Sequence, residues 1–66
     1  MKFFEKMRHK FITDFVNENK YINRIDICNE FGISIPQASN DLAKWMAQNP
    51  DKIEYNVRSK RYEAVE

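Results

Sequence analysis

The segment Phe31-Gly32-Ile33-Ser34-Ile35-Pro36-Gln37-Ala38-Ser39-Asn40-Asp41-Leu42 decides how this chain folds. Gly32, the only glycine of the chain, predicts the end of one helix, because glycine adopts the left-handed backbone conformation at little cost. Ser34 followed by Gln37 predicts the start of a second helix: the serine oxygen accepts from a free backbone amide while Gln37 reaches back to another. Pro36 fits the first turn, where its missing N–H costs nothing. The segment therefore indicates two helices joined by a short turn.

A helix-turn-helix is the motif that this arrangement predicts, with its second helix in the major groove of DNA. We expect that helix over residues 35–48, since Pro50 follows and proline cannot continue a helix. Helical spacing places a group of apolar residues on its buried side: Ile35, Ala38, Leu42, Trp45 and Met46. The opposite side then carries Gln37, Asn40 and Lys44, with Asp41 as a further candidate for that side.

The polar residues of this second helix are the candidates for DNA contact. Gln37 and Asn40 are one turn apart, and each could bind an adenine edge through two hydrogen bonds, worth about 1–3 kcal/mol of discrimination apiece. The alternatives are that Gln37 only completes the helix cap and that Asn40 is solvated. Ser39 could contact a base or a phosphate, or pack as a small residue near the helix crossing. We expect Lys44 to contact a phosphate, with a solvated lysine as the alternative.

Asp41 does not fit a DNA-facing surface, because phosphates repel a carboxylate. We expect it to pair with a neighbouring cation, for example Arg24 or a residue of the C-terminal hairpin. The alternative is that it accepts a hydrogen bond from the amino group of a cytosine.

Helical periodicity also organises the first half of the chain. A long helix is expected over residues 2–18, with an apolar stripe made of Phe3, Phe4, Met7, Phe11, Ile12, Phe15 and Val16. Tyr21-Ile22 is expected to form a short strand. A further helix is expected over residues 24–31, because Asn23 is a good N-cap. Its inward side chains should be Ile25, Cys28 and Phe31.

The last segment, residues 52–65, changes period from 3.6 to 2 and predicts a β-hairpin around a polar tip. Positive charge is concentrated at that tip, where Arg58, Lys60 and Arg61 occur with no acid among them. We expect these residues and Ser59 to follow the DNA backbone or enter a narrow minor groove, although charge runs are often only solvated. Asn23 and Arg24 are expected to contact a phosphate at the start of their helix.

Three helices followed by a basic hairpin are the order of elements in a winged helix. We therefore expect residues 1–66 to form a single, mainly α domain with the winged helix-turn-helix fold. Neither a signal peptide nor a membrane-spanning run is found in the sequence, and one cysteine cannot form a disulfide framework, so a cytoplasmic protein is expected. No nucleophile–base pair, metal-ligand cluster or phosphate loop is recognisable. We expect no enzyme activity, no cofactor and no metal, and interpret His9 as a surface residue.

A family resemblance agrees with this interpretation. It rests on Asn23-Arg24-Ile25-Asp26-Ile27, Phe31-Gly32-Ile33-Ser34, Pro36-Gln37-Ala38-Ser39, Asp41-Leu42, Pro50, Tyr55 and Lys60-Arg61-Tyr62. The segment from about Asn23 to Ala64, roughly two-thirds of the chain, resembles the N-terminal winged helix of bacterial WYL-domain transcriptional repressors, above all those that regulate anti-phage defence operons. The resemblance implies DNA binding.

This chain departs from the family pattern in two ways. Family members usually continue into a linker and a ligand-sensing WYL domain, whereas this sequence ends at Glu66, directly after the hairpin. An excised domain or a naturally minimal protein, for example of a phage, would both have this length. The first helix also matches poorly. The resemblance therefore does not imply that this chain binds a small-molecule ligand.

The function expected from the sequence is specific binding of double-stranded DNA, as a repressor that acts as a homodimer on an inverted repeat. Phe3 and Phe4 of the first helix are the candidates for the dimer contact. The alternative is a protein-interaction module, such as a phage protein that binds a host regulator or defence component, which the net charge of only +1 would suit. Double-stranded RNA is a third candidate, but its deep major groove excludes a base-reading helix.

Overall fold

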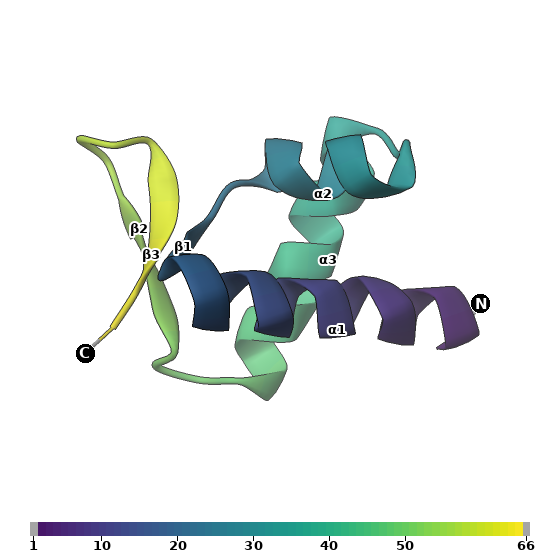
Figure 1. Ribbon diagram of the computed structural model, residues 1–66, viewed down its shortest axis with the longest axis horizontal. Coiled ribbons are helices and arrows are strands. Elements are labelled where there is room, and N and C mark those ends of the chain that lie inside the picture. The colour runs from purple at the N-terminus through teal and green to yellow at the C-terminus, as the bar shows by residue number, and fades with distance from the viewer. Residues whose placement is uncertain (1, 66) are drawn as a thin grey trace.

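The computed structural model describes the backbone of residues 2–65 and the side chains of residues 4–65. Its elements are α1 (Lys2–Asn19), β1 (Tyr21–Ile22), α2 (Arg24–Phe31), α3 (Ile35–Gln48), β2 (Ile53–Asn56) and β3 (Arg61–Ala64) (Figure 1). The strands form one antiparallel sheet in the order β1-β3-β2. Three helices with a C-terminal hairpin confirm the winged helix fold. In this part of the chain, no helix has the length and apolar character needed to cross a membrane.

The hydrophobic core lies between the three helices and the sheet. Its buried members are Ile12, Val16, Ile22, Ile27, Ala38, Leu42, Trp45 and Ile53. The apolar stripe of α1 contributes to the core only through its C-terminal half, because Phe4 and Met7 are about half exposed. Figure 1 shows why: the N-terminal end of α1 extends beyond α2 and α3.

Both helices of the helix-turn-helix begin and end at the expected caps. The Asn23 side chain accepts from the backbone of α2, and Asp26 Oδ2 accepts from Asn23 N at 2.9 Å, which completes a capping box. Gly32 is left-handed, with φ 64°, and its N–H donates to the Cys28 carbonyl. Ser34 Oγ accepts from Gln37 N at 3.4 Å to start α3. These short-range bonds fix the turn between α2 and α3.

Three expectations about individual side chains are wrong. Ile25 is exposed and Ile27 is buried instead, because Ile27 shares a helix face with Phe31, four positions further on, whereas Ile25 does not. Ile35, the first residue of α3, is also exposed. The Gln37 side chain does not return to the Ser34 backbone but donates to Asp41.

The hairpin is formed by β2 and β3, with Tyr55 opposite Tyr62. The two rings pack edge to face, with their centroids 5.1 Å apart. The backbone closes the tip through the Lys60 N–H, which donates to the Asn56 carbonyl at 2.8 Å. Lys60 adopts a left-handed conformation with φ 57°. β1 pairs with the other edge of β3, so the hairpin is held against the helices and does not project alone.

Candidate nucleic-acid interface

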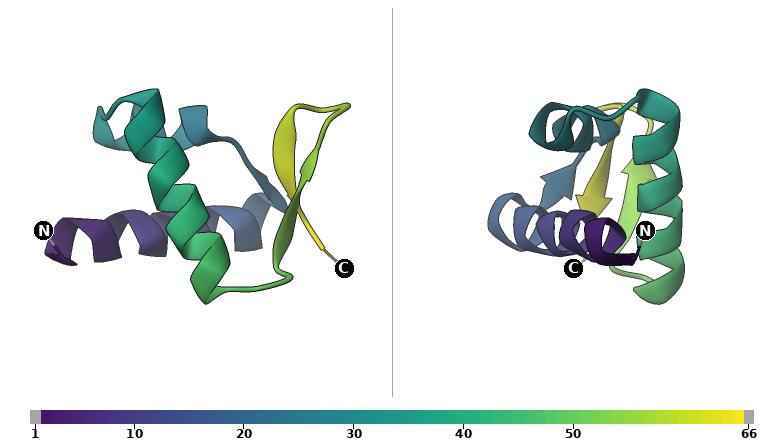
Figure 2. Two further views of the ribbon diagram at one scale, coloured as in Figure 1. Left: turned by 180° about the vertical axis from the view of Figure 1, so that it is seen from behind. Right: turned by 90° about the vertical axis from the view of Figure 1, so that its right-hand side faces the viewer.

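The outer face of α3 is open. Seen from behind (Figure 2, left), α3 crosses in front of α1, and no other element overlies it. Gln37 and Asn40 are exposed, whereas Ser39 is only partly exposed at the edge of the face. The face continues through Ala43 and Ala47, whose small side chains are exposed as well. A groove of a nucleic acid would therefore meet the polar side chains of α3 without a steric obstacle.

Asp41 lies inside the molecule, and its cation is one that the sequence analysis did not identify. Its side chain is 1% exposed, so Asp41 does not lie on the outer side of α3, and the prediction that it pairs with a cation is confirmed. It pairs with Arg8 of α1, whose Nε donates to Oδ2 at 2.5 Å and whose Nη2 donates to Oδ1 at 3.2 Å. Neither Arg24 nor a residue of the hairpin is its partner. A third donor, Gln37 Nε2, reaches Asp41 Oδ1 at 3.3 Å.

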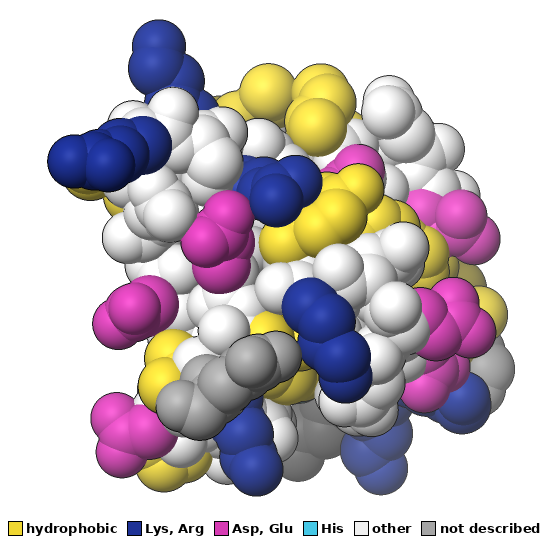
Figure 3. All heavy atoms as spheres, turned by 60° about the vertical axis from the view of Figure 1, so that its left-hand side comes forward, with side chains coloured by type: hydrophobic (Ala, Val, Ile, Leu, Met, Phe, Trp, Pro, Cys, Tyr) yellow, Lys and Arg dark blue, Asp and Glu magenta, His cyan; other side chains and the backbone are white. Residues whose placement is uncertain are grey.

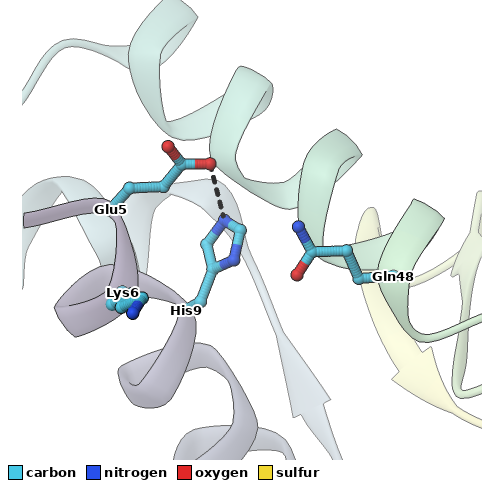
Figure 4. Close-up of a pocket in the computed structure, with 4 residues that line it drawn as sticks. All are labelled: Glu5, Lys6, His9 and Gln48. Carbon is cyan, nitrogen blue, oxygen red and sulfur yellow. Dashed lines mark ion pairs between the residues drawn. The ribbon is translucent and has the colours of Figure 1, made fainter. Parts of the chain in front are cut away.

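Lys44 lies on the side of α3 that faces α1. Its Nζ is 3.7 Å from Glu5 Oε1, and its side chain is 60% exposed, so the ion pair is loose. His9 Nε2 is 3.9 Å from the same oxygen of Glu5 and has no hydrogen-bond partner among the described residues. Figure 4 shows Glu5 and His9, together with Lys6, around a cavity of about 270 Å³ that Gln48 of α3 also lines. His9 is not the surface residue we expected, because its side chain is only 14% exposed.

The tip of the hairpin is organised by an acid, Glu63, that the sequence analysis did not single out. Its carboxylate accepts from Asn56 Nδ2 at 2.9 Å, from Ser59 Oγ at 3.1 Å and from Arg61 Nε at 3.1 Å. The hydrogen bond from Asn56, followed by those from Arg61 and Ser59, lowers the pKa of Glu63 below its ordinary value. Asn56 also accepts from the backbone N–H of Arg58, at 2.8 Å.

The basic residues of the hairpin fall into two groups. The Arg61 guanidinium lies 4.0 Å above the centre of the Tyr21 ring, and its Nε is bonded to Glu63, so this cation is held within the fold. Arg58 and Lys60 are exposed, and their side chains form no hydrogen bond or ion pair with the described residues. Figure 3 shows positive side chains projecting from the upper part of the face that carries the hairpin.

Asn23 connects the start of α2 to the tip of the hairpin. Besides capping α2, its Nδ2 donates to the Lys60 carbonyl at 3.0 Å. The polar atoms of Asn23 therefore already have partners within the protein, while the neighbouring Arg24 is exposed. No group of three or more His, Cys, Asp or Glu residues suited to a metal ion is found within residues 2–65.

Comparison with known proteins agrees with this geometry. Residues 5–66 match the family model of the BrxR transcriptional regulator winged helix-turn-helix domain. The chain is 36% identical over 61 residues to the DNA-binding transcriptional repressor CapW of Escherichia coli, which covers 92% of this chain and 20% of the relative. It is 34% identical over 62 residues to CapW of Pseudomonas aeruginosa, covering 94% of this chain and 21% of the relative.

The chain thus spans about a fifth of the length of these curated relatives. The resemblance to the winged helix of bacterial transcriptional repressors is confirmed by both comparisons. This chain belongs to the family of BrxR-type winged helix-turn-helix domains.

Proposed function

We propose that this domain binds double-stranded DNA in a sequence-specific manner and serves transcriptional repression. The observation that carries the proposal is the open face of α3, on which Gln37 and Asn40 are exposed one helical turn apart. Glutamine and asparagine are the side chains that bind an adenine edge through two hydrogen bonds. The relatives are DNA-binding transcriptional repressors, which supports the same function. Such a function belongs in the bacterial cytosol or nucleoid.

α3 supplies the base contacts of the proposed complex, through Gln37 and Asn40, with Ser39 at the edge of the same face. Exposed cations supply the phosphate contacts: Arg24 at the start of α2, Lys44 on α3, and Arg58 and Lys60 at the hairpin tip, with Ser59 between them. Asn23 and Arg61 support these contacts indirectly. Their polar groups form hydrogen bonds within the protein that hold the tip of the hairpin in place.

Dimerisation on an inverted repeat is part of the same proposal. A single helix-turn-helix offers few base contacts, and twofold symmetry doubles their number. The N-terminal half of α1 is the proposed contact, because it extends beyond the other helices and half-exposes Phe4 and Met7. The side chain of Phe3 lies outside the described residues. A monomeric mass by light scattering at tens of micromolar, with and without DNA, would exclude this part of the proposal.

One observation favours a second function, the binding of a protein partner. The net charge is only +1, which gives weaker long-range attraction to DNA than a basic domain would have. Binding of this kind would depend little on salt, because no condensed counterions are released.

Selection from random duplex DNA at near-physiological salt, followed by sequencing and a salt titration of the enriched site, tests the proposal. We expect an inverted repeat and an affinity that falls steeply with salt, by about 0.9 log units per log unit of salt for each phosphate contacted. Asn40→Ala should reduce discrimination among sequences, whereas Arg58→Ala should weaken binding to all duplexes alike. Failure to recover any duplex would reject DNA binding in favour of a protein partner.

A further inference from the structure

The chain of hydrogen bonds from Arg8 through Asp41 to Gln37 joins the interior of the domain to the outer face of α3. We propose that Asp41, held by Arg8, fixes which end of the Gln37 amide faces outward, and thereby makes α3 prefer adenine over guanine at one base pair. This inference rests on the proposed DNA binding through α3. It makes Asp41 a positioning residue for base recognition, although Asp41 itself is too deeply buried to touch DNA.

The orientation of the Gln37 amide follows from the chemistry of its partner. An ionised carboxylate has no proton to donate, so both Asp41 oxygens can only accept. Arg8 donates to each of them, through Nε and Nη2. Gln37 lies one turn before Asp41 on α3, and the group that it offers to Oδ1, at 3.3 Å, has to be its NH2. The carbonyl oxygen of the amide is therefore turned away from Asp41.

Gln37 then presents an acceptor and one remaining N–H to a ligand on the outer face. Adenine offers the complementary pair in the major groove, a donor at N6 and an acceptor at N7. Guanine offers two acceptors, O6 and N7, so its O6 would meet the carbonyl oxygen of Gln37 with no proton between them. A free glutamine could rotate its amide to avoid this clash of acceptors, but the hydrogen bond to Asp41 opposes that rotation.

Stability alone does not require this ion pair. Buried ion pairs are often replaceable by apolar residues of similar volume without loss of stability. Apolar residues at these two positions would fill the space between α1 and α3 but would leave the Gln37 amide free. The ion pair thus confers a property on the surface of α3 that a hydrophobic contact could not confer.

The substitution Asp41→Asn provides a test with a predicted change of sign. Arg8 can only donate, and its shorter bond runs from Nε to Oδ2, so the introduced amide keeps its oxygen at that position. Its NH2 then takes the Oδ1 position, which faces Gln37, and the longer bond from Arg8 Nη2 is lost. Gln37 then has to turn its own oxygen inward, which places both of its N–H groups on the outer face. Two donors match O6 and N7 of guanine. The variant should therefore prefer guanine where the unaltered protein prefers adenine.

The experiment uses the duplex that is selected by the unaltered protein. A Gln37→Ala variant then identifies the base pair that Gln37 reads, because discrimination among bases is lost at that position. Competition titrations then compare adenine with guanine at that position. We expect the unaltered protein to bind adenine at least about fivefold more tightly, and Asp41→Asn to bind guanine more tightly by a similar factor. The Gln37→Ala variant should bind both equally.

A second variant keeps the test decisive if Asp41→Asn does not fold, which circular dichroism and the fluorescence of Trp45 report. The double substitution Arg8→Met with Asp41→Leu removes the charges together, and should fold and bind adenine and guanine within about twofold of each other. If either folded variant retains the original preference for adenine, the inference is wrong while DNA binding stands. Absence of binding by the unaltered protein would instead reject the function on which the inference rests.

Discussion

Asn23 Nδ2 donates a 3.0 Å hydrogen bond to the carbonyl oxygen of Lys60, which links the start of α2 to the tip of the hairpin. The two residues are far apart in the sequence, and this bond joins two proposed phosphate-contacting segments into one rigid unit. Arg24 follows Asn23, and Arg58 precedes Lys60 by two residues, so the bond sets the spacing between exposed cations. Asn23 thus serves the interface by holding its parts together.

Substitution of Asn23 separates this role from helix capping. Serine caps a helix nearly as well as asparagine but has no amide to reach Lys60, so Asn23→Ser should lower the free energy of unfolding only by the value of this one hydrogen bond, about 0.5–1.5 kcal/mol. Its affinity for DNA should nevertheless fall, by about two- to tenfold, because a hydrogen bond worth about 0.5–1.5 kcal/mol no longer orders the tip. Asn23→Ala, the control, should lose about 1 kcal/mol more stability than Asn23→Ser, because it removes the helix cap as well as the bond to Lys60. Equal DNA affinity of Asn23→Ser and the original protein would contradict the link.

Replacement of Glu63 by glutamine tests whether the hairpin tip needs its acid. Simple electrostatics predicts tighter DNA binding, because a negative charge is removed from a basic segment. We expect weaker binding instead, since the carboxylate of Glu63 accepts from Asn56, Ser59 and Arg61, and an amide cannot accept from all three as well. Fluorescence anisotropy with a labelled duplex measures the difference.

The matched control for this prediction is Glu54→Gln. Glu54 lies directly opposite Glu63 in the sheet, carries the same charge and is exposed. Its substitution should leave DNA binding unchanged or slightly tighter, because its side chain accepts no hydrogen bond from the described residues of the hairpin. Tighter binding by both variants would show that charge, and not the hydrogen bonds of Glu63, controls affinity.

The stability contributed by Glu63 should depend on pH in a defined direction. Its pKa in the folded protein is lowered from the ordinary value of 4.5, first by the hydrogen bond from Asn56. A carboxylate with a lowered pKa stabilises the fold above its unfolded-state pKa and loses this contribution as the pH falls through the folded-state pKa. Stability should therefore drop below about pH 4.5, and less so in Glu63→Gln. Urea unfolding of both proteins, at pH values above and below the ordinary pKa of 4.5, checks this.

The two groups of basic residues at the tip should differ in their salt dependence. Arg58→Ala and Lys60→Ala should each reduce the slope of log affinity against log salt by about 0.9, because their side chains are exposed and make no described contacts. Arg61→Ala should reduce the stability of the fold, since Arg61 lies against Tyr21 and is bonded to Glu63. Identical slopes for Arg58→Ala and the original protein would remove Arg58 from the phosphate contacts.

The features that could be predicted from the sequence are those that depend on neighbouring residues. Asn23, Gly32 and Ser34 act on backbone groups within four positions, so their pattern is sufficient to locate the ends of helices. Helical spacing likewise identified Leu42 and Trp45 as core residues of α3. These local signals were sufficient to predict the winged helix fold.

The features that the sequence did not predict are contacts between distant parts of the chain. Arg8 and Asp41 are 33 residues apart, and nothing in the helical pattern of α1 distinguishes Arg8 from a solvated arginine. The role of Glu63 was missed because a single acid beside a basic tip has no sequence signature. Ile27 rather than Ile25 is buried because the packing of α2 against α3, which periodicity does not specify, selects the face of a short helix.

The left-handed conformation of Lys60 has a consequence for how this hairpin can be changed. A residue with a Cβ pays about 1–2 kcal/mol for that conformation, and glycine does not. Lys60→Gly should therefore raise the melting temperature while weakening DNA binding, so a screen for thermal stability and a screen for operator affinity would rank it in opposite directions. Lys20 has the same conformation, with φ 67°, at the end of α1, away from the tip of the hairpin. Lys20→Gly should raise the melting temperature and leave the affinity for the operator unchanged. This difference would identify the positive charge at position 60 as a feature kept for function, against the conformational preference of the backbone.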